Sequence, residues 1–357
     1  MATVSSTHRL PMPSFFAQSR KKMDKVWRVP YQERAAQAEE WALQHSLQAA
    51  AKDSFRICLM PIDCQNTFCL PDFELFVGGR SGRGAIDDCE RLCEFIYREL
   101  GVITEIDPTL DTHKAMQIFH SVFLVDEHGK HPAPMTPILV EEVERGKWKI
   151  NPGVVSSTGG NYMALERHLL HYCRELKAGG KYTLFVWPYH GMLGGIGHAL
   201  VAAVEEACFF HNLARCSQTG FEIKGGNALT ENYSVLQPEV LTTDGGRPIA
   251  QKNASFVKKL LDFDAVVIAG QAKSHCVAWT IDHLLKEILA QDAKLAQKVY
   301  LLEDCTSAVF VPKSVTGLPE DIDFTDDADK AFQRFADAGM HLVKSTDPIE
   351  SWEGIKL

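Results

Sequence analysis

The sequence has no long apolar run and no cysteine-dense segment, and each absence argues against a class of protein. No stretch of the 357 residues approaches the length of a membrane span, so we expect no membrane partner. The ten cysteines are scattered, without a Cys-x-x-Cys pair, which is typical of reduced thiols in a cytoplasmic protein. The N-terminus also lacks an apolar segment followed by small residues, so we expect no secretory signal.

Charge and glycine spacing argue against two further kinds of ligand. The net charge of −9 disfavours nucleic acid or an anionic surface as the main partner. The glycines at positions 191, 194, 195 and 197 have neither the GxGxxG nor the GxxxxGK[ST] register, so we predict no nucleotide-phosphate loop.

What the sequence does contain is an alternation of strand-like and helix-like segments from residue 55 onward. The predicted strands are 56–62, 102–106, 182–187, 220–223, 265–269 and 298–302. The predicted helices are 31–51, 84–100, 161–177, 195–214, 255–261, 274–290 and 327–338. This alternation predicts an α/β fold: a doubly wound, three-layer α/β/α arrangement around a mainly parallel sheet, which we expect to have six strands.

The same pattern suggests how the chain is divided. We expect an N-terminal arm and helix over 1–54, with a partly ordered polar tail up to about residue 30. The main domain is predicted over 55–345, with an insert at about 121–156, and a C-terminal tail over 346–357.

Polar residues follow the predicted strands, at the edge where parallel sheets bind ligands. Asp63 follows the first strand, Lys224 precedes two glycines after the fourth, and Cys276 lies in the first helical turn after the fifth. The N-terminus of a helix lowers a thiol's pKa and offers N–H groups to an oxyanion, which favours Cys276 as a nucleophile. Asp63 could then act as general base beside the Lys224 ammonium. Taken singly, the three residues also fit a buried structural thiol, a turn cap and a solvated surface cation.

A second set of residues suggests a metal ion and a flat ligand. Asp111, His113 and His190 form a ligand set that suits Zn²⁺, Fe²⁺ or Mn²⁺, and His120 is a candidate fourth ligand. Hydrogen-bonded structural histidines are the alternative. Two aromatic residues next to these groups, Phe68 and Trp187, could sandwich an aromatic ring or could be ordinary core residues.

These residues stand in short motifs that together resemble a known family. The motifs are Asp63-x-Gln65-Asn66-x-Phe68, Asp111-x-His113, Trp187-Pro188-x-His190, Lys224-Gly225 with Tyr233-Ser234, and Ser274-x-Cys276-Val277. Over about residues 55–305 and in this order, they resemble the nicotinamidase branch of the isochorismatase-like cysteine hydrolases.

The resemblance implies a function and roles for the residues. It implies an Asp63/Lys224/Cys276 triad, an oxyanion hole from the backbone N–H groups of Ala272 and Cys276, and a cis peptide between Gln271 and Ala272. It also implies one divalent metal ion, zinc first with iron or manganese as alternatives, on Asp111, His113 and His190, and a ring pocket lined by Phe68 and Trp187. The activity implied is hydrolysis of nicotinamide, or a related aromatic carboxamide, to the acid and ammonia through a cysteine thioester, by a homo-oligomer.

The chain also departs from the pattern of that family. Gly191 stands where nicotinamidases usually have a cysteine, and Ser274-His275 replaces the common Asp-Tyr before the nucleophile. The loop 114–120 lacks the usual Trp-His-Pro-x-x-His wording. Two alternatives therefore stay open: a hydrolase of the same scaffold acting on another small amide, ureide or N-carbamoyl compound, and a non-catalytic binding or scaffold protein.

Overall fold

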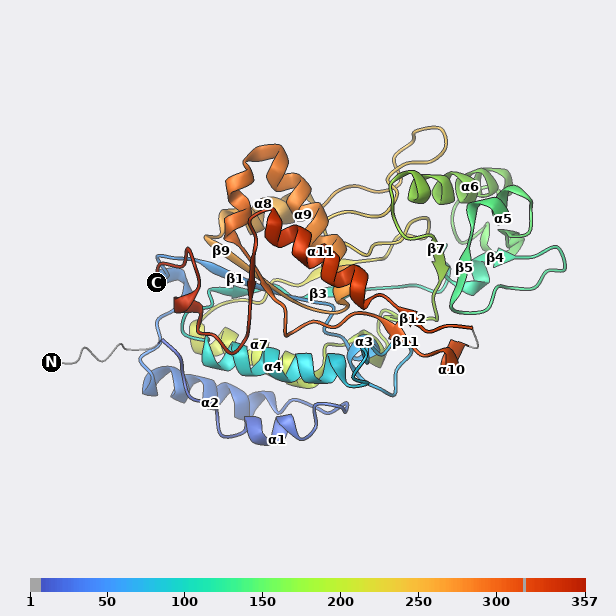
Figure 1. Ribbon diagram of the computed structural model, residues 1–357. Coiled ribbons are helices and arrows are strands. Elements are labelled where there is room, and N and C mark those ends of the chain that lie inside the picture. The colour runs from blue at the N-terminus through green and yellow to red at the C-terminus, as the bar shows by residue number, and fades with distance from the viewer. Residues whose placement is uncertain (1–7, 317–318) are drawn as a thin grey trace.

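The computed structural model describes residues 8–316 and 319–357 and has a parallel sheet at its centre (Figure 1). Its strands, in the order β13-β10-β9-β1-β2, are β13 (His341–Val343), β10 (Val299–Leu302), β9 (Ala265–Gly270), β1 (Ile57–Ile62) and β2 (Glu105–Ile106). Every pairing between these neighbours is parallel. The strands β1 and β9 are buried at each position, which explains their nearly continuous apolar sequences.

Helices cover both faces of this sheet, as the alternation predicted. One face carries α4 (Gly84–Arg98) and α7 (Ala202–Arg215), and the other carries α8 (Ala254–Asp262), α9 (Ala278–Gln291) and α11 (Thr325–Asp337) (Figure 1). Successive residues of β1 enter the two cores in turn, Ile57 and Leu59 on the α4 side and Cys58 and Met60 on the α9 side. The doubly wound three-layer arrangement is therefore confirmed.

The predicted number of strands in the sheet was wrong, because the central sheet has five strands within the described residues. The predicted strand 182–187 appears as β7 (Leu184–Val186), which pairs antiparallel with β5 (Thr136–Ile138) outside the central sheet. The predicted strand 220–223 appears as β8 (Glu222–Lys224), which pairs with β3 (Thr109–Asp111) in a separate two-stranded sheet. The sheet instead gains β13, a half-exposed strand of only three residues.

The remaining part of the fold packs around a third core, which β7 shares with the predicted insert. Figure 1 shows these elements beyond one end of the central sheet. They are β4 (Leu124–Val125), β6 (Lys149–Ile150), α5 (Val140–Glu144) and α6 (Tyr162–Ala178). Short elements elsewhere are α1 (Phe16–Arg20), α3 (Asn66–Cys69), α10 (Lys313–Thr316), β11 (Phe310–Val311) and β12 (Ile322–Asp323).

The N-terminal segment is more ordered than a polar tail, although residues 1–7 lie outside the described residues. Phe15 and Phe16 are buried, and the Phe15 ring lies 5.3 Å from the ring of Phe210 on α7. The helix α2 (Tyr31–Gln44) is shorter than predicted and packs against α7. The prediction of a polar tail did not take these two phenylalanines into account. Their buried apolar surface stabilises the segment against the core.

Two helices begin differently from the predictions. The helix predicted over 195–214 begins only at Ala202, after a 3₁₀ turn over Ile196–His198. The helix predicted over 274–290 begins as a π-helical turn, Lys273–Val277, that continues into α9. Among the described residues, no helix combines the length and the apolar character that a membrane crossing requires.

Candidate active site

The structure brings the predicted nucleophile, base and cation together at the carboxyl ends of the strands. The Nζ atom of Lys224 lies 3.0 Å from Oδ2 of Asp63 and donates to Sγ of Cys276 at 3.5 Å. Asp63 comes directly after β1, Lys224 is the last residue of β8, and Cys276 lies in the π-helical turn after β9. All three side chains are buried, so their charges interact with little screening from water.

The backbone around Asp63 and Cys276 is unusual. Asp63 has a φ of +47°, in the left-handed region that non-glycine residues seldom adopt, and its carboxylate accepts a hydrogen bond from the Thr109 hydroxyl. The peptide bond between Gln271 and Ala272 is cis, as the resemblance implied. The N–H group of Ala272 has no acceptor within the described part of the chain, so it is free to donate to a ligand next to Cys276.

Burial sets the protonation of these groups. It raises the pKa of the Cys276 thiol well above the ordinary value, although the Lys224 ammonium lowers it. The lowered thiol pKa expected from the helix N-terminus is therefore not found, because desolvation outweighs it. Burial also raises the pKa of Asp63 against the charge of Lys224. At neutral pH the thiol therefore holds its proton.

A cluster of buried histidines lies beside these residues. Nitrogens of His113, His120 and His190 lie within 4.8 Å of one another. In each ring the other nitrogen, Nδ1, faces a backbone carbonyl, at 3.1 Å for His113, 3.1 Å for His120 and 2.8 Å for His190. Because a carbonyl can only accept, Nδ1 carries the proton and Nε2 presents its lone pair.

Asp111 joins the histidine cluster to Lys224. Its Oδ1 lies 3.1 Å from Nε2 of His113 and 2.8 Å from Nζ of Lys224, and its Oδ2 lies 3.6 Å from Nε2 of His190. The structure thus places the predicted ligands together and adds the candidate fourth, His120. The Nε2 atoms of His113 and His120 are buried and have no hydrogen-bond partner within 8–316 and 319–357. These orphaned lone pairs beside a carboxylate fit a divalent metal ion.

A side-chain amide and two glycines position this cluster. The Gln65 amide accepts from the Asp111 N–H at 2.7 Å and donates to the Asp111 carbonyl at 3.0 Å, so it pairs with the end of β3 like a neighbouring strand. Gly191 has a φ of +56°, and a Cβ there would lie 2.7 Å from the Asp111 carbonyl oxygen. A Cβ on Gly225 would lie 2.8 Å from Asp111 Oδ1. The lack of space around Asp111 explains why both positions are glycine. One of them is Gly191, where nicotinamidases usually have a cysteine.

The two predicted ring-pocket residues both border His190. The ring centroid of Phe68 lies 5.6 Å from that of His190, and the centroid of Trp187 lies 6.5 Å from it. The indole N–H of Trp187 donates to the Tyr233 hydroxyl at 3.1 Å, which fixes the ring. Phe68 and Trp187 are each only 8% exposed.

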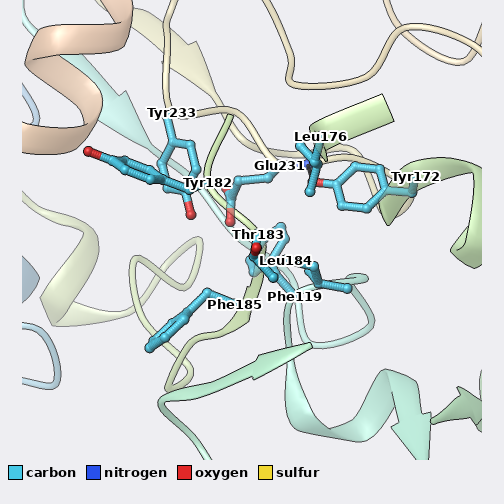
Figure 2. A pocket seen from close by; sticks show the side chains of 9 residues that line it. All are labelled: Phe119, Tyr172, Leu176, Tyr182, Thr183, Leu184, Phe185, Glu231 and Tyr233. Atoms are coloured by element: carbon cyan, nitrogen blue, oxygen red, sulfur yellow. Dashed lines mark hydrogen bonds between the residues drawn. The ribbon is translucent and has the colours of Figure 1, made fainter. Parts of the chain in front are cut away.

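Sequence reasoning missed one charged residue at this site. Glu231 is buried, and its Oε1 lies 4.0 Å from Nε2 of His113. Burial raises its pKa to about 8, and the charge of Asp111 adds to the effect. Figure 2 shows Glu231 and Tyr233 among the residues that line a cavity of about 10 Å³. An acidic residue in the polar stretch between β8 and α8 gives no signal that distinguishes it from a solvated loop residue.

Comparisons with known proteins give a match in structure but not in sequence. No protein-family profile matches the chain, and neither does any curated protein sequence. The chain is similar to the solved structure of a nicotinamidase/pyrazinamidase from Acinetobacter baumanii, with 18% identity, 83% of this chain and 99% of that chain covered, and a TM-score of 0.50. It is also similar to the yeast nicotinamidase, with 17% identity, 80% and 99% covered, and a TM-score of 0.47. At such identities the first of these similarities shows the fold alone.

Proposed function

We propose that this chain, which has the α/β fold of the Acinetobacter nicotinamidase structure, is a metal-dependent cysteine amidohydrolase. Its proposed substrate is nicotinamide or a related aromatic carboxamide, which it converts to the acid and ammonia. The observation that carries the proposal is the position of Lys224, whose Nζ lies 3.0 Å from Asp63 and 3.5 Å from the Cys276 thiol beside a histidine cluster. A buried thiol, base and cation in contact form the arrangement of an activated nucleophile.

The first half of the proposed reaction forms a thioester. Because burial raises the pKa of the Cys276 thiol, the thiol keeps its proton until a base accepts it. Asp63 is that base. The Lys224 ammonium stabilises the thiolate, and Sγ attacks the amide carbon. The N–H groups of Ala272 and Cys276 donate to the oxyanion. Asp63 then gives its proton to the amide nitrogen, the C–N bond breaks, and ammonia leaves.

The second half of the reaction releases the acid. Asp63, ionised again, takes a proton from a water molecule, and the resulting hydroxide attacks the thioester carbon. The bond between carbon and Sγ breaks, and the thiolate regains the proton from Asp63. The contact with Lys224 stabilises Asp63 in its ionised form between the two halves.

Two groups of residues would hold the substrate ring. Phe68 and Trp187 would flank the ring beside His190. The metal ligands would be Asp111, His113 and His190, with His120 as the fourth, and we propose zinc, with iron or manganese as alternatives. A bound ion would supply a Lewis acid for a ring nitrogen, which orients the carboxamide toward the thiol.

The setting proposed for the enzyme is a homo-oligomer in the cytoplasm. All ten cysteines are free thiols, which suits a reducing compartment. Phe221, directly before β8, and Ile223 within it have exposed apolar side chains, which are candidates for a contact between subunits. Light scattering on the purified protein gives its mass and tests the oligomer directly.

The experiment that tests the function is ammonia release from nicotinamide by the purified protein. Cys276→Ala should abolish turnover, whereas Cys216→Ala, which removes an exposed thiol at the end of α7, should leave it unchanged. Metal content is measured on the same samples, and about one ion per chain is expected. A metal-loaded protein that ignores nicotinamide would move the substrate to other small amides. A protein with neither metal nor amide turnover would contradict the proposal.

A further inference from the structure

Glu231 is a buried carboxylate beside the histidine cluster that the proposed reaction leaves without a role. Its side chain is 6% exposed, and its Oε1 lies 4.0 Å from Nε2 of His113. That nitrogen is one of the orphaned lone pairs described above. Oε1 already accepts from the Asn232 N–H, so two acceptor atoms face each other here, which is unfavourable unless a cation or a proton lies near both.

Hydrogen bonds hold Glu231 in position, and no side-chain cation in the described part of the chain pairs with it. The Asn232 N–H donates to Oε1 at 3.0 Å, and the Glu231 N–H donates to the Tyr172 hydroxyl at 3.2 Å. Within 8–316 and 319–357, no lysine or arginine forms an ion pair with Glu231. Nearby Glu239 differs, because its carboxylate lies 2.8 Å from the Lys181 ammonium. Glu231 is thus oriented by the backbone and lacks a side-chain cation.

The region around Lys224 contains more carboxyl groups than side-chain cations. Lys224 contacts both Asp63 and Asp111, so its single positive charge is already shared by two carboxylates. Glu231 places a third carboxyl group in the same buried region, 4.0 Å from the orphaned nitrogen of His113. An unbalanced buried charge is costly, and a divalent cation on the histidine nitrogens would balance it.

We propose that Glu231 is an anionic positioning residue of the metal site and strengthens metal binding through its charge. This inference rests on the proposed metal site and adds a residue that its predicted ligand set does not contain.

The test is the zinc affinity of the metal-free protein, measured by competition with a chromogenic chelator. Glu231→Gln keeps the size of the side chain and removes its charge, and it should weaken zinc binding by about 10- to 100-fold. Glu231→Asp keeps the charge and should lose less affinity than Glu231→Gln. The matched control is Glu239→Gln, a buried glutamate paired with Lys181, which should leave zinc affinity unchanged.

The outcomes separate this inference from the proposed function. If the wild type binds zinc and Glu231→Gln binds it equally well, the role of Glu231 is overturned while the proposed ligand set stands. A loss of affinity that is the same for all three variants would indicate a purely structural role and would also overturn the inference. If the wild type binds no divalent ion, both the inference and the metal dependence of the proposed function fail.

Discussion

At Cys276, burial and the charge of Lys224 act on the thiol in opposite directions, and burial is the stronger effect. A nucleophile that is protonated at rest depends on its base more than a preformed thiolate does. Replacing Asp63 with asparagine should therefore lower kcat by at least about 100-fold, within the range of general-base effects. Steady-state ammonia release measures this loss. A residual kcat near that of the wild type would mean that another group takes the proton.

The pH dependence of activity follows from the raised pKa of Asp63. Burial moves this pKa above the model-peptide value of 3.8, so the carboxylate becomes protonated at a higher pH than an exposed aspartate. A protonated Asp63 cannot accept the thiol proton, so kcat/KM should fall as the pH drops through the raised value. A pH profile measures this, with circular dichroism at each pH as a control for folding. Activity that stays constant down to pH 3.8 would contradict the role of Asp63.

Single residues at the site were predictable from sequence where their chemistry and their position agreed. Asp63, Lys224 and Cys276 each follow a strand, so the rule for parallel sheets places them at one edge. His120 was predicted less firmly, because its position after the loop 114–119 cannot be fixed from spacing, yet its ring nitrogen lies with those of His113 and His190. Glu231 was missed because only the folded backbone between β8 and α8 buries it.

Among the elements, the end of β3 depends on a side chain from the turn after β1. Gln65 forms three hydrogen bonds, two to the Asp111 backbone and one to the His198 carbonyl. Gln65→Ala leaves buried backbone groups unpaired, at a cost of about 1–3 kcal/mol each, and frees Asp111 to move. We expect lower stability in urea and weaker metal binding. Unchanged metal affinity would show that β8 alone holds Asp111 in place.

A second element-level prediction concerns the loop between β7 and α7. Gly191 has a positive φ, and a Cβ there would clash with the Asp111 carbonyl. Gly191→Ala should cost about 1–3 kcal/mol of stability and weaken metal binding, since His113 donates its N–H to the Gly191 carbonyl. Gly194→Ala is the matched control, because it also has a positive φ but has open space around the new Cβ. Equal loss of metal affinity in both variants would contradict the role given to the clash.

Sequence patterns identified most helices and strands but could not assign every strand to a sheet. The run 182–187 is apolar enough for a buried strand, and its periodicity does not reveal that β5 of the insert is its partner. The turn that carries Cys276 was predicted as the start of an α-helix, and its π-helical hydrogen bonding depends on the strands that precede it. Pairing partners and local helix type are set by long-range contacts, which a linear pattern does not contain.

On the scale of the whole molecule, a buried ion pair links the N-terminal helix α2 to α7. Nε of Arg34 on α2 lies 2.6 Å from Oε1 of Glu206 on α7, and both side chains are buried. The Ser19 hydroxyl donates to the same carboxylate, and the Arg34 guanidinium lies 4.0 Å from the centroid of the Phe15 ring. Removing one partner of such a pair leaves the other charge buried and uncompensated.

Arg34→Ala should therefore lower the free energy of unfolding by about 3–5 kcal/mol. The control is Arg80→Ala, since Arg80 forms exposed ion pairs with Asp323 and Asp326 and should contribute at most about 1 kcal/mol. Urea denaturation followed by circular dichroism measures both. Because Arg34 contacts none of the proposed catalytic residues, kcat of the folded variant should stay within about twofold of the wild type, given that distant sites usually act independently. Equal stability losses for the two variants would mean that the N-terminal segment adds little to the stability of the core.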